Sequence, residues 1–437
     1  MFEEHVYAEG MSAVERVGDM AAKDPTLHVD ILIQVYRKYN DIVLTAFAND
    51  ACFVLFLSIA CKRFINNNAV TFLDQSTRKS PEFFAAYCDT LLSRSSEAPQ
   101  LQLDDAVVGF TAMLQYIDDK DVFQKCCTQV LATRLLQRLS VSEGMEEKLM
   151  HKFGNACGNG YAWTLQRMFR DVSASKEVNE QFVRHMKNSN ECFRLDFSIH
   201  VLASGLWPFR LSSHLKLPPE LEGIVQSFAT FYSGLYSTRK IQPLHNLSKG
   251  ELVTSCFKED YTLHASTFQI AVLLQYNQGL SFTVQQLQEG TSMDMRILQQ
   301  VLESLLKCRL ILCHGEKTEK FVKLRPDTIV SLFEGYHNNN LVVDINEPLE
   351  EELKAEQHVT QKMIDDERKM LVQSSIVRIM KIRKTLQHQE LITEIVRQLE
   401  RKFGPDTNLI EECITNLIEN GYLEKDGLQL NTYHYVA

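Results

Sequence analysis

The chain has 437 residues, of which 45% are hydrophobic and 23% are charged, and its formal net charge is −10. The length predicts about two to four domains, and the composition excludes a fibrous or wholly disordered chain. The acidic balance argues against general nucleic-acid binding, because such binding depends on Lys and Arg that neutralise phosphates.

The chain contains 11 cysteines at irregular spacing, without a CxxC pair. This argues against a disulfide framework and a zinc cluster, so we expect no metal and no cofactor, a reducing compartment, and cysteines that are mostly small buried residues. The N-terminus lacks the basic region of a signal peptide. The apolar run Ala51–Cys61 is too short to span a bilayer, which needs about 20 residues, and predicts one buried helix.

Residues 1 to about 190 are predicted to be helical. Ser80-Pro81-Glu82 is typical of a helix start, with Ser as the N-cap and Pro at the first position. The region Arg94–Gln100 breaks that helix, and helical periodicity then resumes. These elements favour stacked helical bundles.

A change of pattern occurs near Cys192. The segment Asp196–Leu202 alternates polar and apolar residues, which predicts a strand, and Gly205 and Pro208 close it. Helical character returns over Leu217–Tyr232. We therefore predict a small α/β region.

A three-helix pattern followed by strands occurs twice. The first copy has predicted helices near Ser266–Tyr276, Thr283–Glu289 and Asp294–Lys307 and a strand at Arg309–Leu312. The second has helices near Ser375–Thr385, Gln389–Phe403 and Asp406–Asn420, then a hairpin signal at Asp426-Gly427. Three helices and a β-wing form a winged helix, and the charged stretch Glu350–Lys369 between the copies predicts a linker helix.

Winged helices often bind DNA, which raises a nucleic-acid function as an alternative. The helix Asp406–Asn420 contains Asp406, Glu411, Glu412 and Glu419 but no Lys or Arg. Its negative charge would oppose the phosphates, so a protein-interaction role is favoured.

Several motifs, in order along the chain, resemble those of the cullin family: Arg63–Asn68 (RFINNN), Tyr116–Gln124 (YIDDKDVFQ), Leu195–Phe209 (LDFSIHVLASGLWPF), Ser248–Val253 (SKGELV), Ile376–Lys381 (IVRIMK) and the tail LIENGYLEK…YHYVA. Cullins hold a RING protein in a ubiquitin ligase. The resemblance implies that the adaptor-binding N-terminal repeats are absent, in a natural short form, a partial gene model or a C-terminal fragment.

The expected fold is mainly α with a small α/β region. It comprises a remnant of the last helical repeat (1–78), a helical bundle (79–190), an α/β RING-binding region (191–257), a first winged helix (258–345), a charged linker helix (346–371) and a C-terminal winged helix with the modifier-acceptor lysine (372–437).

The resemblance makes Lys381 the acceptor of a ubiquitin-like modifier through an isopeptide bond, a modification called neddylation. On a continuous helix, Arg378 and Lys384 would flank Lys381 on the same face. Their positive charge would support the neutral amine that attacks a thioester. Ile376, Ile379, Ile382 and Leu386 are expected to form the buried stripe. By pattern alone, the basic residues would be an ordinary solvated face.

The resemblance also makes Asp196–Leu202 a docking strand for the RING protein, with Phe197, Ile199 and Val201 on one side. A closed intrachain strand is the alternative, and Trp207 is expected in the core. Pro243 departs from the family pattern and would disturb local strand pairing and weaken RING docking, because proline lacks an amide donor.

Thr133 stands where the family has Lys. We therefore expect a weakened groove for the acidic tail of a conjugating enzyme, with Arg134 and Arg138 remaining. The alternative is a solvated helix face.

The implied function is a non-catalytic scaffold, cytoplasmic and nuclear. Its expected partners are a RING-box protein, a ubiquitin-conjugating enzyme, and the modifier with its conjugation and removal machinery; a cullin-exchange factor is also admitted. Adaptor, nucleic-acid and membrane binding are not expected. One alternative is a truncated competitor that occupies RING protein and modifier without recruiting substrate. Another is a cysteine-thioester ligase, for which no activated thiol is apparent.

Overall fold

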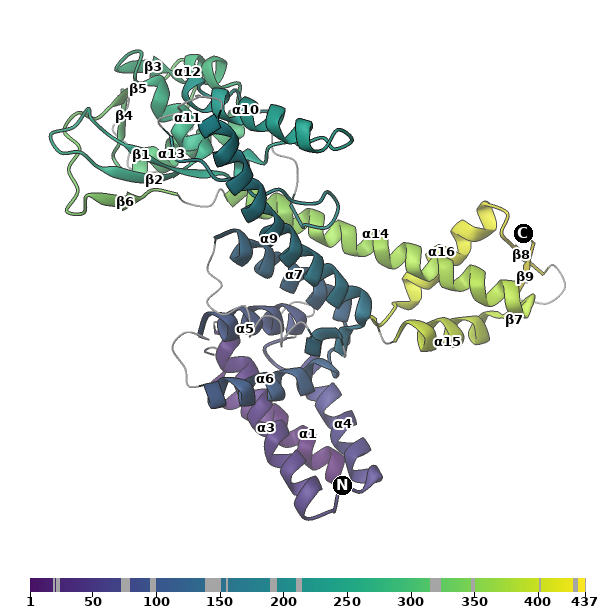
Figure 1. Ribbon diagram of the computed structural model, residues 1–437. Coiled ribbons are helices and arrows are strands. Elements are labelled where there is room, and N and C mark those ends of the chain that lie inside the picture. Colours follow the sequence, from purple (N-terminus) through teal and green to yellow (C-terminus); the bar gives the residue numbers. More distant parts are fainter. Residues whose placement is uncertain are drawn as a thin grey trace. The chain divides into compact units, whose positions relative to one another are not determined.

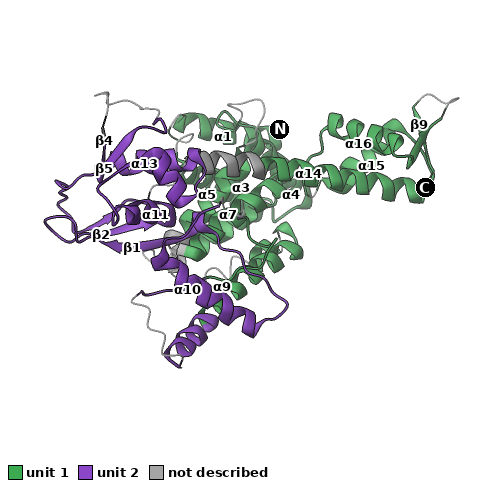
Figure 2. Ribbon diagram, turned by 90° about the horizontal axis from the view of Figure 1, so that it is seen from above, with its two compact units in different colours: residues 1–176, 200–208, 360–437 green, residues 177–199, 209–359 purple. Residues whose placement is uncertain are grey.

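The computed structural model of the chain describes residues 1–18, 20, 24–71, 79–94, 100–137, 151–154, 156–188, 195–209, 214–314, 324–346, 350–400, 402–426 and 431–436. These residues form two compact units, which Figure 2 shows in different colours. Unit 1 holds residues 1–176, 200–208 and 360–437, and unit 2 holds residues 177–199 and 209–359.

The first part of unit 1 is helical, as predicted (Figure 1). Its helices are α1 (Phe2–Val17), α3 (Pro25–Thr45), α4 (Ala51–Asn66), α5 (Ser80–Arg94), α6 (Gln100–Leu114), α7 (Lys120–Gln137) and the start of α9 (Asn159–Asn188). Asp24 caps α3 by accepting hydrogen bonds from the amides of Thr26 and Leu27 at 2.9 and 3.3 Å. Pro25 occupies the first helical position, where a missing amide donor costs nothing.

The prediction that Ala51–Cys61 forms a helix is confirmed, but the prediction that the helix is buried is wrong. Leu57 and Phe64 of α4 are buried, whereas Leu55 is 57% exposed. The apolar residues of α4 are distributed over all its faces, so the periodicity of its sequence does not distinguish a buried face from an exposed one. Within the described residues, no helix combines the length and apolar character that crossing a membrane requires.

Unit 2 contains the small sheets and the first winged helix. Its remaining helices are α10 (Pro219–Leu235), η1 (His245–Leu247), α11 (Thr267–Gln275), α12 (Val284–Thr291) and α13 (Met295–Lys307). One sheet has the order β1-β2-β6, built from β1 (Lys249–Val253), β2 (Thr262–Ser266) and β6 (Val342–Asp344). The other has the order β3-β5-β4, built from β3 (Ser281–Thr283), β5 (Ile329–Leu332) and β4 (Ile311–His314). The α11-α12-α13 helices and the second sheet enclose one apolar core, as a winged helix requires.

The C-terminal part of unit 1 is built on residues 360–383 of α14 (Glu350–Arg383). It also contains β7 (Thr385–Gln387), α15 (His388–Leu399), α16 (Thr407–Glu419), β8 (Leu423–Lys425) and β9 (Thr432–Tyr435), and Figure 1 shows α15 and α16 beside the last turns of α14. β9 pairs with both β7 and β8 in an antiparallel sheet.

This region confirms the second winged helix, with one difference from the expected elements. The predicted linker helix and the predicted helix Ser375–Thr385 are one continuous helix, because no Pro or Gly interrupts residues 350–383. The domain limits expected from the sequence stay predictions.

Candidate functional site

Lys381 lies in the last turn of α14, and its side chain is exposed. Among the described residues it has neither a hydrogen-bond partner nor an ion-pair partner. The helix ends two residues later at Arg383, and Lys384 takes a left-handed conformation with φ 69°. The Lys384 amide donates to the Met380 carbonyl at 2.8 Å, which closes the helix end.

The turn that carries Lys381 is anchored from beneath. Ile376, Ile379 and Met380 are buried in the core of the C-terminal winged helix, and Leu386 packs against the same core. The prediction that Ile382 belongs to this stripe is wrong, because its side chain is 75% exposed. It follows Lys381 directly on the helix, so both side chains lie on the solvent side of the last turn.

The expected flanking charges are engaged elsewhere. Arg378 donates to the Oε1 atom of Gln398 at 2.8 Å, and the Lys384 ammonium lies 5.1 Å from the centre of the Tyr435 ring. The expectation that Lys384 continues the helix at i+3 is wrong, because α14 ends before it. Lys381 is therefore presented as a single amine rather than as part of a continuous basic stripe.

The second predicted site is the segment around Asp196–Leu202. The expected strand is not formed within the described residues, where no strand pairs with it. Its backbone instead bonds to side chains of α9. Asn179 accepts from the Ile199 amide at 2.9 Å and donates to the Ile199 carbonyl at 2.6 Å.

Two further α9 side chains continue this pattern. The Ser175 hydroxyl accepts from the Val201 amide at 2.8 Å and lies 3.3 Å from the Val201 carbonyl. Asp171 accepts from the Ala203 amide at 2.8 Å. We call Asp171, Ser175 and Asn179 the α9 row. Sequence reasoning missed this row, although three short polar residues spaced four apart on one helix are a signal for it.

Aromatic side chains fix both ends of the segment. The Phe197 ring lies 6.1 Å from the rings of Phe182 and Phe228. Trp207 is buried, as predicted, and its indole nitrogen donates to Asp171 at 2.9 Å. The side chains of Ile199 and Val201 are half-buried between these anchors.

Pro243 lies in irregular chain before η1 and outside every described strand. The neighbouring strand β1 keeps an unbroken antiparallel register with β2, from Lys249 opposite Ser266 to Val253 opposite Thr262. The expected disturbance of this pairing is therefore not observed. A missing amide donor has no consequence where no strand partner needs one.

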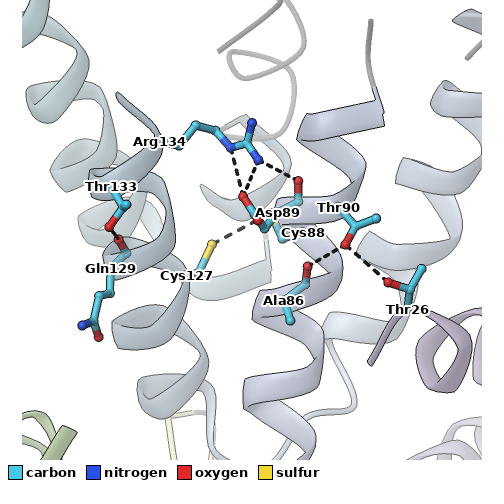
Figure 3. A network of polar contacts seen from close by, with 9 residues as sticks. All are labelled: Thr26, Ala86, Cys88, Asp89, Thr90, Cys127, Gln129, Thr133 and Arg134. Atoms are coloured by element: carbon cyan, nitrogen blue, oxygen red, sulfur yellow. Dashed lines mark hydrogen bonds and ion pairs between the residues drawn. The ribbon is translucent and has the colours of Figure 1, made fainter. Parts of the chain in front are cut away.

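The expected basic groove on α7 is not supported by the arrangement of Arg134. This side chain is only 5% exposed and forms an ion pair with Asp89 of α5, as Figure 3 shows. Its Nε atom donates to the Asp89 carboxylate at 3.0 Å, and its Nη2 atom donates to the Asp89 carbonyl at 3.0 Å. Thr133 is exposed, and Arg138 lies outside the described residues.

The cysteines are less buried than expected. Cys61, Cys88, Cys127 and Cys413 are buried, but others are half-buried or, like Cys52, exposed. Burial raises the pKa of the Cys61 thiol to about 12, which opposes thiolate formation. In the part of the chain that is described, no group of His, Cys, Asp and Glu has the arrangement of a metal site.

Comparison with known proteins accounts for these regions together. Residues 1–179 match the Cullin alpha solenoid domain, residues 201–336 the Cullin alpha+beta domain, and residues 367–428 the Cullin protein neddylation domain. The whole chain aligns with cullin-1 of Dictyostelium discoideum at 38% identity and with cullin-1 of Caenorhabditis elegans at 33% identity. Cullin-4A of Mus musculus is 30% identical over 86% of the chain.

The chain belongs to the cullin family. It spans 57% and 56% of the length of the two cullin-1 relatives and 50% of the cullin-4A relative. Lys381 lies within the matched neddylation domain of this cullin, and residues 201–203 of the segment held by the α9 row lie within the matched alpha+beta domain.

Proposed function

We propose that this cullin is a scaffold of a ubiquitin ligase that docks a RING protein with its conjugating enzyme and accepts a ubiquitin-like modifier at Lys381. The observation that carries the proposal is the exposed Lys381 amine at the end of α14, within the region that matches the neddylation domain. This amine has no hydrogen-bond or ion-pair partner in the described part of the chain.

The surroundings of Lys381 suit an acceptor. An isopeptide bond forms when a neutral amine attacks the thioester carbonyl at the modifier's C-terminus, so the amine must reach a second protein's active site. The buried Ile379 and Met380 hold the turn rigidly, while Lys381 itself has no hydrogen bond or ion pair among the described residues that must first be broken.

The segment Phe197–Ala203 is the proposed RING-docking element. Within the described residues it belongs to no sheet, and the amides of its alternate residues Ile199, Val201 and Ala203 bond to α9. This alternation is the pattern of a chain that can accept an added strand. Phe197 packs at its first residue, and Trp207, which follows the segment, bonds to Asp171. The conjugating enzyme would reach the scaffold through the RING protein, since the α7 arginine expected to bind its tail is buried.

In this proposal the chain is not a catalyst. Its contribution is proximity, because fixing two reactants in one complex replaces a bimolecular encounter by an effectively unimolecular one. None of its side chains needs to touch the reacting thioester.

Reconstituted modification tests the proposal. The purified chain is incubated with the modifier, its activating and conjugating enzymes, and a cullin-type RING protein, and adducts are mapped by mass spectrometry. We expect one adduct, at Lys381, that requires the RING protein. The variant Lys381→Arg should lose it, whereas Lys384→Arg, at the neighbouring exposed lysine, should retain it. Undiminished modification of Lys381→Arg would refute the acceptor assignment.

A further inference from the structure

The spacing of the α9 row along its helix matches the spacing of the backbone groups that it binds. Asp171, Ser175 and Asn179 are spaced four residues apart, a rise of roughly 6 Å along a helix. Their partners Ala203, Val201 and Ile199 are spaced two apart, roughly 6.7 Å along an extended chain. The two repeats nearly coincide, so successive side chains of the helix meet alternate residues of the segment, in antiparallel order.

The hydrogen bonds also resemble those of a strand. In an antiparallel ladder, a residue exchanges both its amide and its carbonyl bond with the residue opposite. The Asn179 carboxamide makes both bonds to Ile199, at 2.9 and 2.6 Å. The Ser175 hydroxyl makes only the first of these bonds well: it accepts from the Val201 amide at 2.8 Å, while its single proton is directed to the Asp171 carbonyl at 2.7 Å and the Val201 carbonyl lies at 3.3 Å. Each of these bonds joins residues of the same unit.

We propose that the α9 row acts as a substitute strand. It holds Phe197–Ala203 as an edge strand before any partner arrives. This inference rests on the proposed docking function. It adds which residues order the segment before binding and which backbone groups hydrogen-bond to the partner. Because the amides of Ile199, Val201 and Ala203 point to α9, those of the intervening residues point the other way.

The opposite edge is open at two positions. Ser198 and Leu202 have no hydrogen-bond partner within the described part of the chain. Alternate donors and acceptors along an extended backbone are what an added strand recognises, so the matching partner is an extended segment of the RING protein. Asp171, Ser175 and Asn179 are positioning residues, because they act through the segment and touch no partner.

The row reduces the entropy that binding must overcome. Fixing the backbone of one residue costs roughly 1–2 kcal/mol, which corresponds to roughly a tenfold change in an equilibrium constant. A segment already extended by Asn179 and Ser175 avoids part of this loss when the partner binds.

Residue-resolved amide hydrogen exchange tests the alternation. In the free chain, the Ile199 and Val201 amides should exchange at least about tenfold more slowly than those of Ser198 and Leu202. Adding a cullin-type RING protein should slow Ser198 and Leu202 and leave Ile199 and Val201 little changed. Protection that appears on binding at Ile199 and Val201 instead would overturn the assignment of the two edges.

Variants of the row test its contribution to binding. Ser175→Ala combined with Asn179→Ala should weaken RING binding about a hundredfold, since two residues then need ordering on association, at roughly tenfold each. Ser173→Ala, at an exposed serine two residues away without a described partner, should bind as the unmodified chain does. Ser175→Thr retains the hydroxyl, so it should keep the RING affinity that Ser175→Ala loses. If the double variant does not fold, Asn179→Asp takes its place. Its carboxylate still accepts from the Ile199 amide but can no longer donate to the Ile199 carbonyl.

The outcomes separate this inference from the docking function. If the unmodified chain binds the RING protein and the folded row variants bind it equally well, only the substitute-strand proposal is refuted. No binding by the unmodified chain would refute the docking function itself and, with it, the role given to the row.

Discussion

The guanidinium of Arg368 holds the carboxylate of Asp121 through hydrogen bonds of 2.5 and 2.8 Å, although the two residues are 247 positions apart in the sequence. The same guanidinium donates to Asp119 at 2.9 Å and stacks over the Phe403 ring at 4.7 Å. Arg368 is 19% exposed and Asp119 10%. This ion pair joins the middle of α14 to the start of α7 within unit 1.

Loss of Arg368 should release α14 locally. Arg368→Ala leaves two partly buried carboxylates without their guanidinium, and we expect a loss of about 2 kcal/mol in the free energy of unfolding. The control Lys362→Ala removes an exposed cation from the same helix that has no described partner, and should change stability by less than about 0.5 kcal/mol. Urea denaturation measures both.

The pairing itself is checked by a double-mutant cycle with Asp121→Asn. The combined loss should be smaller than the sum of the single losses, because both changes break the same bonds. Strict additivity would show that Arg368 and Asp121 do not stabilise each other.

The ion pair between Arg134 and Asp89 should respond asymmetrically to substitution. Arg134 is 5% exposed, whereas the Asp89 side chain is 43% exposed. Asp89→Ala removes a carboxylate from a buried cation, so we expect a loss of about 3 kcal/mol. Arg134→Met leaves a carboxylate that water can reach, so the loss should be about 1 kcal/mol. Thermal and urea unfolding would contradict this account if the Arg134 variant were the less stable one.

The surroundings of Gly10 and Gly160 predict opposite effects of substitution by alanine on the stability of the chain. A Cβ atom on Gly10 of α1 would lie 2.6 Å from the Phe64 ring, which is fully buried, so Gly10→Ala should lower stability by about 2 kcal/mol. A Cβ atom on Gly160, at the start of α9, would meet nothing within 4 Å. Gly160→Ala should therefore stabilise the chain by about 0.5 kcal/mol, through the lower backbone entropy of the unfolded state. Equal unfolding midpoints for the two variants would contradict the close approach of α1 and α4.

A buried histidine should make the helical region sensitive to acid. His28 is fully buried against the Phe83 ring, and its ring nitrogens have no partner in the described structure. Burial lowers its pKa from 6.5 to about 4. The unfolded chain then binds more protons than the folded chain between these pH values, so stability is full above about pH 6.5 and falls as the pH drops toward 4.

The expected loss attributable to His28 between pH 7 and pH 5 is about 2 kcal/mol. His28→Leu should remove this part of the pH dependence, whereas His151→Leu, at an exposed histidine, should retain it. Denaturation curves of the three proteins at both pH values decide the matter. An unchanged pH dependence in His28→Leu would mean that the histidine titrates normally.

Local sequence signals determined much of the fold. A helix was predicted at Asp294–Lys307, and the structure has α13 at Met295–Lys307 with Asp294 as its N-cap. Both winged helices follow from such signals, because helix caps and apolar periodicity are local properties. The motif IVRIMK also determined the choice of Lys381, and the structure adds that this lysine is exposed and without a described partner.

Tertiary structure decided which polar residues meet. Arg134 reads as a surface residue in sequence, but it is buried because Asp89 lies 45 positions away and directly opposite in space. The segment predicted as a strand at Asp196–Leu202 instead bonds through its backbone to side chains of α9, because alternation specifies exposure on two sides and not the identity of the neighbour. A hydrogen-bond partner at Asn179 or Ser175 depends on how the chain folds back, and periodicity carries no such information.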